Sequence, residues 1–131
     1  MKFELPISIL PGEKFDGGKW YYAQTLLDAF SEFYASAKNT LFICKGNGVT
    51  GNQLGSICID ISSRIGVVTS YDYDYIEVEI DENIIPKNIL KLLKEEKFEA
   101  NPRFIIKEVD YNNCILSMVL LSFDLKLRES E

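Results

Sequence analysis

The stretch from residue 114 to residue 126 constrains the fold most, because its apolar residues would occupy both faces of an extended chain. A strand that is apolar on both faces has to be covered on both, whereas an alternating strand buries only one. The apolar run is broken at Ser117 and Ser122, and it is too short to cross a bilayer as a helix. It therefore predicts the central, most buried strand of a sheet and no membrane association.

Shorter patterns elsewhere predict the remaining strands. Residues 2–9 alternate polar and apolar side chains, and Pro6 within them suggests an edge strand. Further strands are predicted over 40–45, 57–61, 65–69, 75–81 and 104–109. Turns at 70–74 and 110–113 would join neighbouring strands into hairpins.

Two helices are predicted. Apolar residues recur every three or four positions over 19–38, and Pro86 suits the first turn of a helix over 86–97. Asn101-Pro102 marks a loop after the second helix. The order β-α-β-β-β-β-α-β-β predicts one α+β domain over residues 1–131, with two helices on a mainly antiparallel sheet of about six or seven strands.

Composition removes several kinds of active site. The chain has 131 residues and no histidine, so Ser-His-Asp and Cys-His systems are excluded. Cys44, Cys58 and Cys114 lie in apolar runs without a CxxC pair, which is typical of reduced thiols packed as small hydrophobes. The alternating N-terminus does not match a signal peptide. We expect a cytoplasmic protein with no cofactor, and a binding role is favoured over an enzymatic one.

Acidic residues are concentrated in one segment. The net charge is −6, and the segment between Arg64 and Lys87 contains six acids and no base. Such a segment repels a phosphate backbone and attracts a basic protein surface. The charge distribution therefore disfavours direct nucleic-acid binding and predicts a protein partner with a basic surface.

Tyrosines lie between these acids. A strand over 75–81 would bury Ile76, Val78 and Ile80 and turn the residues between them outward. Tyrosine offers rigid contact area that is enriched at binding interfaces. The predicted partner-binding stripe consists of Tyr71, Asp72, Tyr73, Asp74, Tyr75, Glu77, Glu79 and Asp81. The alternative is a solvated acidic face that blocks sheet-to-sheet aggregation.

A glycine-rich loop over 46–55 contains the pattern GxGxxG after a predicted strand. Dinucleotide binding also needs a helix after the third glycine, and only three residues separate Gly51 from Gly55 and the next strand. We therefore predict a connection between strands. A small-molecule or nucleotide-binding loop remains an alternative, with contacts from Gly46, Asn47, Gly48, Thr50, Gly51 and Asn52.

Neither carboxylate motif predicts a metal site. Asp124-Leu125-Lys126 matches the D-x-K end of a restriction-endonuclease-like motif, with Asp110 upstream. About ten strand residues, at about 3.3 Å each, keep those two carboxylates apart. Asp72-Tyr73-Asp74 lacks the glycine and glutamate of a calcium loop.

The sequence thus favours a small, acidic, non-catalytic binding or inhibitory module that acts on a basic protein surface. Immunity proteins and inhibitors carried by mobile elements share this description, which is an analogy of class. Two alternatives stay open. One is a nucleotide or small-molecule binder that uses the glycine loop, and the other is an oligomeric subunit that buries the apolar surface of its C-terminal hairpin.

Overall fold

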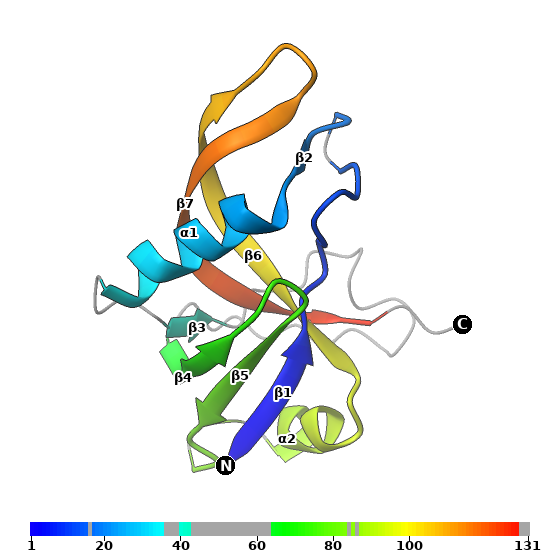
Figure 1. The fold of residues 1–131 in the computed structure, drawn as a ribbon. Coiled ribbons are helices and arrows are strands. Elements are labelled where there is room, and N and C mark those ends of the chain that lie inside the picture. The colour runs from blue at the N-terminus through cyan, green and yellow to red at the C-terminus, as the bar shows by residue number, and fades with distance from the viewer. Residues whose placement is uncertain (16, 36–39, 43–63, 84, 86, 129–131) are drawn as a thin grey trace.

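Seven strands and two helices make up the described part of the chain, which is residues 1–15, 17–35, 40–42, 64–83, 85 and 87–128 of the computed structural model (Figure 1). In chain order they are β1 (Lys2–Pro6), β2 (Trp20–Tyr21), α1 (Ala23–Ala35), β3 (Thr40–Phe42), β4 (Arg64–Tyr71), β5 (Tyr75–Ile80), α2 (Lys87–Lys94), β6 (Phe98–Val109) and β7 (Cys114–Leu127). The predicted class, a single α+β domain, is confirmed.

β7 is the central strand, as its two apolar faces predict. On one edge it pairs antiparallel with β6 along most of its length. On the other edge it pairs in parallel with β2 through Cys114 and Ile115, and with β3 through Phe123 and Asp124. The predicted hairpin around 110–113 is therefore confirmed, and β7 gains two further partners that the sequence did not indicate.

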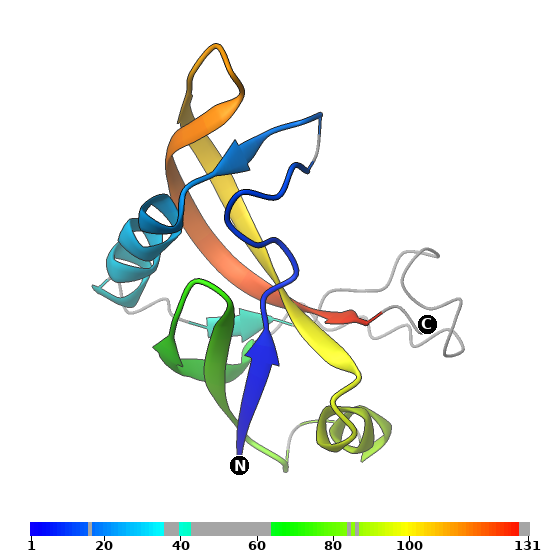
Figure 2. The same cartoon turned by 45° about the vertical axis from the view of Figure 1, so that its right-hand side comes forward.

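The sheet is mainly antiparallel and curls back towards its own edge. Its strand order is β1-β5-β4-β3-β7-β2, with β6 on the other edge of β7. Beyond β1, Ile7 bridges to Ala100 of β6, and the Ser8 N–H donates to the Ala100 carbonyl at 2.9 Å. The chain around β1 therefore links the two ends of the strand order, and Figure 2 shows β1 and β6 approaching each other.

Aromatic side chains hold α1 against the sheet. The ring of Phe30 stacks on that of Phe123 at 5.4 Å, and the Phe33 ring meets Phe123 edge-on at 5.8 Å. Phe30 and Phe123 are both fully buried. α2 lies near the other end of the sheet, beside β1, and buries Ile89 and Leu93 (Figure 1). Neither described helix is long and apolar enough to cross a membrane.

Two predictions differ from the structure. The helix predicted from residue 19 begins at Ala23, because Trp20 and Tyr21 pair with β7 instead. The loop predicted at Asn101-Pro102 lies inside β6, where Pro102 pairs with Phe123. Among the described strands, β6 pairs with β7 alone. Proline is tolerated there because its missing N–H can fall on the side of β6 that has no strand partner. The strand predicted over 57–61 lies outside the described residues.

The end of α2 uses an unusual residue. The Lys97 N–H donates to the Leu92 carbonyl and the Glu96 N–H to the Leu93 carbonyl, a pattern that closes a helix when the residue after its end is left-handed. Glu96 occupies that position with a φ of 58°. Glycine is the usual residue here, because a β-carbon makes the left-handed conformation costly.

We expect Phe123→Ala to lower the free energy of unfolding by about 3–5 kcal/mol, because it removes the ring that Phe30 and Phe33 pack against. Tyr111→Ala is the matched control, since this aromatic residue is 95% exposed at the tip of the same hairpin. It should change stability by less than about 0.5 kcal/mol. Urea unfolding measures both, and equal effects would contradict the assignment of Phe123 to the core.

Candidate functional site

Four acids of the predicted stripe have local structural partners. The Glu77 carboxylate lies 3.8 Å from Lys2 Nζ, and that of Glu79 lies 3.6 Å from the N-terminal ammonium. The carboxylate oxygens of Asp72 and Asp81 accept hydrogen bonds from backbone N–H groups one and two residues further along the chain. Half of the predicted stripe therefore consists of acids that have a partner within the fold.

The tyrosines of the stripe do not share one face. Tyr71 is half-buried and stacks on Phe30 with ring centroids 4.5 Å apart, so it packs against α1. Tyr73 is exposed in the turn between β4 and β5. Tyr75 begins β5 and pairs with Pro6 of β1. Of the three tyrosines in the predicted stripe, Tyr73 and Tyr75 therefore remain accessible to a partner, although Tyr75 is partly covered.

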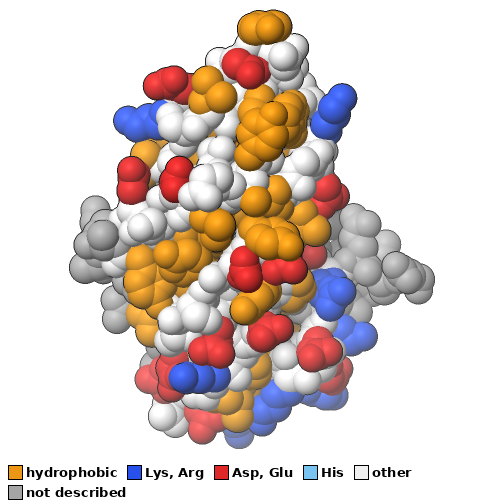
Figure 3. All heavy atoms as spheres, in the orientation of Figure 1, with side chains coloured by type: hydrophobic (Ala, Val, Ile, Leu, Met, Phe, Trp, Pro, Cys, Tyr) orange, Lys and Arg blue, Asp and Glu red, His pale blue; other side chains and the backbone are white. Residues whose placement is uncertain are grey.

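An open groove of about 330 Å³ brings part of the stripe together with residues distant in sequence. It lies where the end of β1 and the start of β5 meet the start of β6, and its lining is Glu4, Pro6, Asp74, Tyr75, Glu96, Phe98 and Arg128. We call this the β1–β5 groove. Figure 3 shows acidic and hydrophobic side chains interspersed over this part of the molecule. Only Asp74 and Tyr75 of the lining were predicted as site residues.

The carboxylates of the β1–β5 groove are poorly compensated. Glu4 lies directly opposite Glu77 in the pairing of β1 with β5, and like charges in that position are destabilising. Glu77 has Lys2 nearby, whereas no ion pair of Glu4, Asp74 or Glu96 is seen among the described residues. The groove therefore has three acidic side chains and one basic side chain, Arg128.

Sequence reasoning missed Glu4, Glu96 and Arg128 for identifiable reasons. Glu4 lies on the polar side of the first strand. The alternating sequence showed that its side chain faces outward, but not that it lies opposite Glu77. Glu96 reaches the groove because the chain turns left-handed after α2. Arg128 follows β7, and its guanidinium donates to the Glu96 carbonyl at 3.4 Å. Nothing local to Arg128 in the sequence signals this contact.

The carboxylates of the D-x-K motif have separate structural roles. Asp110 accepts hydrogen bonds from the N–H groups of Asn112 and Cys114, which fixes the hairpin turn. Asp124 is buried and pairs with Arg103 Nη2 at 3.0 Å. No group of three or more metal-ligating side chains occurs within the described residues. Asp110 and Asp124 therefore have different partners in the structure, and the absence of a shared metal stays a prediction.

The described cysteine is not an activated nucleophile. Cys114 is a free thiol that is almost completely buried beneath the hairpin turn. Burial raises the pKa of this thiol, and the negative charge of Asp110 raises it further, so the reactive thiolate is disfavoured. Cys44, Cys58 and the predicted ligand loop over 46–55 lie outside the described residues.

The C-terminal hairpin carries a second notable surface. Of the eight exposed large hydrophobic side chains in the described part of the chain, five lie on it, and these are Ile105, Val109, Tyr111, Leu116 and Leu121. Exposed apolar residues that are grouped rather than scattered mark surfaces that bind other proteins. The hairpin is therefore a second candidate interaction surface.

Comparison with known protein families, curated proteins and solved structures finds no match for this chain. The support for each candidate site therefore comes from the geometry of its residues. That geometry offers grooves, carboxylates and aromatic rings that can hold another molecule.

We expect Glu96→Gly to raise the free energy of unfolding by about 1 kcal/mol, because glycine adopts the left-handed conformation without a β-carbon clash. Asn113→Gly is the matched control, since Asn113 is the other described non-glycine residue with positive φ, at 64°. It should gain less, because asparagine tolerates this conformation better than glutamate. Urea unfolding compares them, and a destabilised Glu96→Gly variant would show that the side chain contributes to folding.

Proposed function

We propose that this chain is a small, non-catalytic protein-binding or inhibitory domain whose partner presents a basic surface to the β1–β5 groove. The observation that carries the proposal is that the groove is lined by Glu4, Asp74 and Glu96 together with Tyr75, and by one basic side chain, Arg128. A lysine or arginine side chain entering there would meet opposite charge and an aromatic surface at once. Both interactions favour a cation over a neutral or acidic group.

The left-handed backbone conformation of Glu96 supports the same proposal. A glutamate in the left-handed conformation costs stability that glycine would not, and such residues cluster at functional positions. Here the conformation places the residue in the lining of the groove. Retaining glutamate at this position is explained if its carboxylate contributes to binding.

Several other acids of the predicted stripe already have partners within the fold, so the proposed binding surface includes only part of that stripe. Glu77 and Glu79 are balanced by Lys2 and the N-terminal ammonium, so they add less to an attractive field. Asp74 and Tyr75 are the part of the predicted stripe that lines the groove. Steering of a basic partner by exposed carboxylates raises the association rate and weakens as salt screens it.

The test is capture of partners from native lysate by the immobilised chain at about 50 and about 500 mM salt. A partner captured at low salt should be lost from the double variant Glu4→Lys/Asp74→Lys, because both changes place like charge against a basic surface. The matched control is Glu13→Lys/Glu95→Lys, which makes the same net-charge change at exposed positions outside the groove.

Mass spectrometry identifies what each variant retains, and urea unfolding checks that each is folded. Loss of the same partner from the control would mean that only net charge matters. Retention by the groove variant would remove the β1–β5 groove as the binding surface. The stabilised Glu96→Gly variant adds a separate test, since it should bind more weakly while being more stable.

A second candidate function is an oligomeric subunit, favoured by the exposed apolar side chains of the C-terminal hairpin. Burial of Ile105, Leu116 and Leu121 between copies would remove apolar surface from water. Light scattering across a concentration series measures the mass in solution. A dimer that Ile105→Ser/Leu121→Ser converts to a monomer would support this candidate, and a monomer at every concentration would contradict it.

A further inference from the structure

Among the described residues, one edge of β7 has no strand partner between β2 and β3. β2 pairs only with Cys114 and Ile115, and β3 only with Phe123 and Asp124. No described strand pairs with residues 116–122 on that edge. α1 connects β2 to β3 and runs beside this gap, as Figure 1 shows. The arrangement leaves a space between the helix and the hairpin that no strand fills in the described part of the chain.

This space is an open groove of about 540 Å³, which we call the α1–β7 groove. Its lining is Thr25, Asp28, Ala29, Glu32, Lys107, Glu108, Leu116, Ser117, Met118 and Val119. None of these residues belongs to the β1–β5 groove. The two grooves can therefore be altered separately.

The floor of the α1–β7 groove is apolar. Met118 and Ala29 are buried at its base, Val119 is half-buried, and Leu116 remains 52% exposed. Covering such side chains with a partner removes apolar area from water, which is the main favourable term in association.

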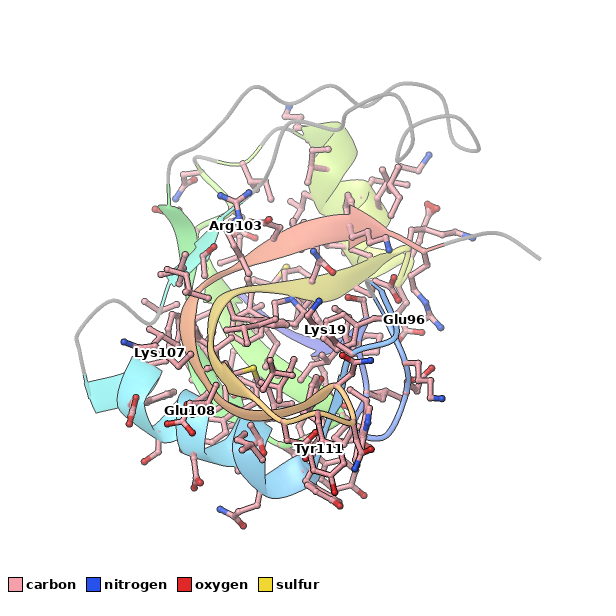
Figure 4. All side chains as sticks on the ribbon, turned by 90° about the horizontal axis from the view of Figure 1, so that it is seen from above. Lys19, Glu96, Arg103, Lys107, Glu108 and Tyr111 are labelled. Atoms are coloured by element: carbon pink, nitrogen blue, oxygen red, sulfur yellow. The ribbon has the colours of Figure 1, made fainter. Side chains whose placement is uncertain are left out.

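The rim of the groove is acidic. Asp28 and Glu32 lie one helical turn apart on α1, and Glu108 comes from β6. Figure 4 shows the side chains of Lys107 and Glu108 on the side of the hairpin that faces α1. No ion pair involves these three carboxylates among the described residues, although Asp28 accepts a hydrogen bond from Gln24 at 2.8 Å. Lys107 is the one basic residue in the lining.

We propose that the α1–β7 groove docks a segment of a partner protein in which apolar side chains alternate with lysine or arginine. The apolar side chains would cover Leu116 and Val119, and the basic ones would meet Asp28, Glu32 and Glu108. Charge complementarity selects this occupant, because an acidic segment would be repelled by the three carboxylates.

The test uses fluorescein-labelled synthetic peptides that alternate leucine with lysine, leucine with glutamate, or serine with lysine. Fluorescence anisotropy measures their affinity for the full chain. The leucine–lysine peptide should bind most tightly. Glu32→Lys/Glu108→Lys should weaken its binding roughly tenfold by replacing two attractions with repulsions. Leu116→Ser should weaken it roughly fivefold by removing apolar contact.

Two controls separate this proposal from the β1–β5 groove and from net charge. Glu13→Lys/Glu95→Lys and Glu4→Lys/Asp74→Lys each make the same net-charge change elsewhere, and both should leave the leucine–lysine peptide bound. Urea unfolding confirms that every variant is folded. Binding lost equally in all three charge variants would overturn the proposal, as would binding unaffected by Glu32→Lys/Glu108→Lys.

Self-association of the chain also tests whether a partner segment or a second copy covers the α1–β7 groove. If the chain forms a dimer that Leu116→Ser dissociates, and the peptide does not compete with that dimer, then a second copy covers the groove and the proposal is wrong. A monomeric chain that binds the leucine–lysine peptide through this groove supports it. Failure here leaves the proposal for the β1–β5 groove intact, because the two sets of variants share no residue.

Discussion

Pairing along both edges of β7 is the interaction on which the rest of the structure depends. β6 covers one edge, while β2 and β3 each cover one end of the other. Phe123 lies where these contacts meet α1, since its ring packs against Phe30 and Phe33. Strand pairing satisfies the backbone groups along the edges of β7, whereas α1 covers apolar side chains on one of its faces.

The same arrangement creates the candidate sites. Among the described residues, β2 and β3 pair only with the two ends of one edge of β7, and the α1–β7 groove lies beside the stretch between them. At the other site, the chain passes from β1 towards β6 through Ile7 and Ser8, and Glu96 follows the end of α2. Side chains from several elements meet there. Each groove therefore lies where the described helices and strands meet one another.

Some carboxylates of the chain have partners within the fold, and others have no ion pair among the described residues. Glu77 and Glu79 are balanced by the N-terminal strand, and Asp72 and Asp81 bond to nearby backbone groups. The carboxylates that line the two grooves lack ion pairs within the described residues. A carboxylate without an opposite charge costs little in water but adds to the attraction of a basic surface. The acidity of the chain is thus explained in part by structure and in part by the proposed binding.

The sequence by itself determined the α+β class, the C-terminal hairpin, the buried central strand and the acidic segment, because periodicity and turn residues act over a few neighbouring positions. It could not show that Trp20 and Tyr21 would leave the predicted helix to pair with β7. Nor could it place Glu4 opposite Glu77 or bring Glu96 beside Tyr75. Those positions depend on strand order and register, which are set by contacts between residues far apart in the chain. Only the tertiary structure therefore decided which acids remain unbalanced and where the grooves lie.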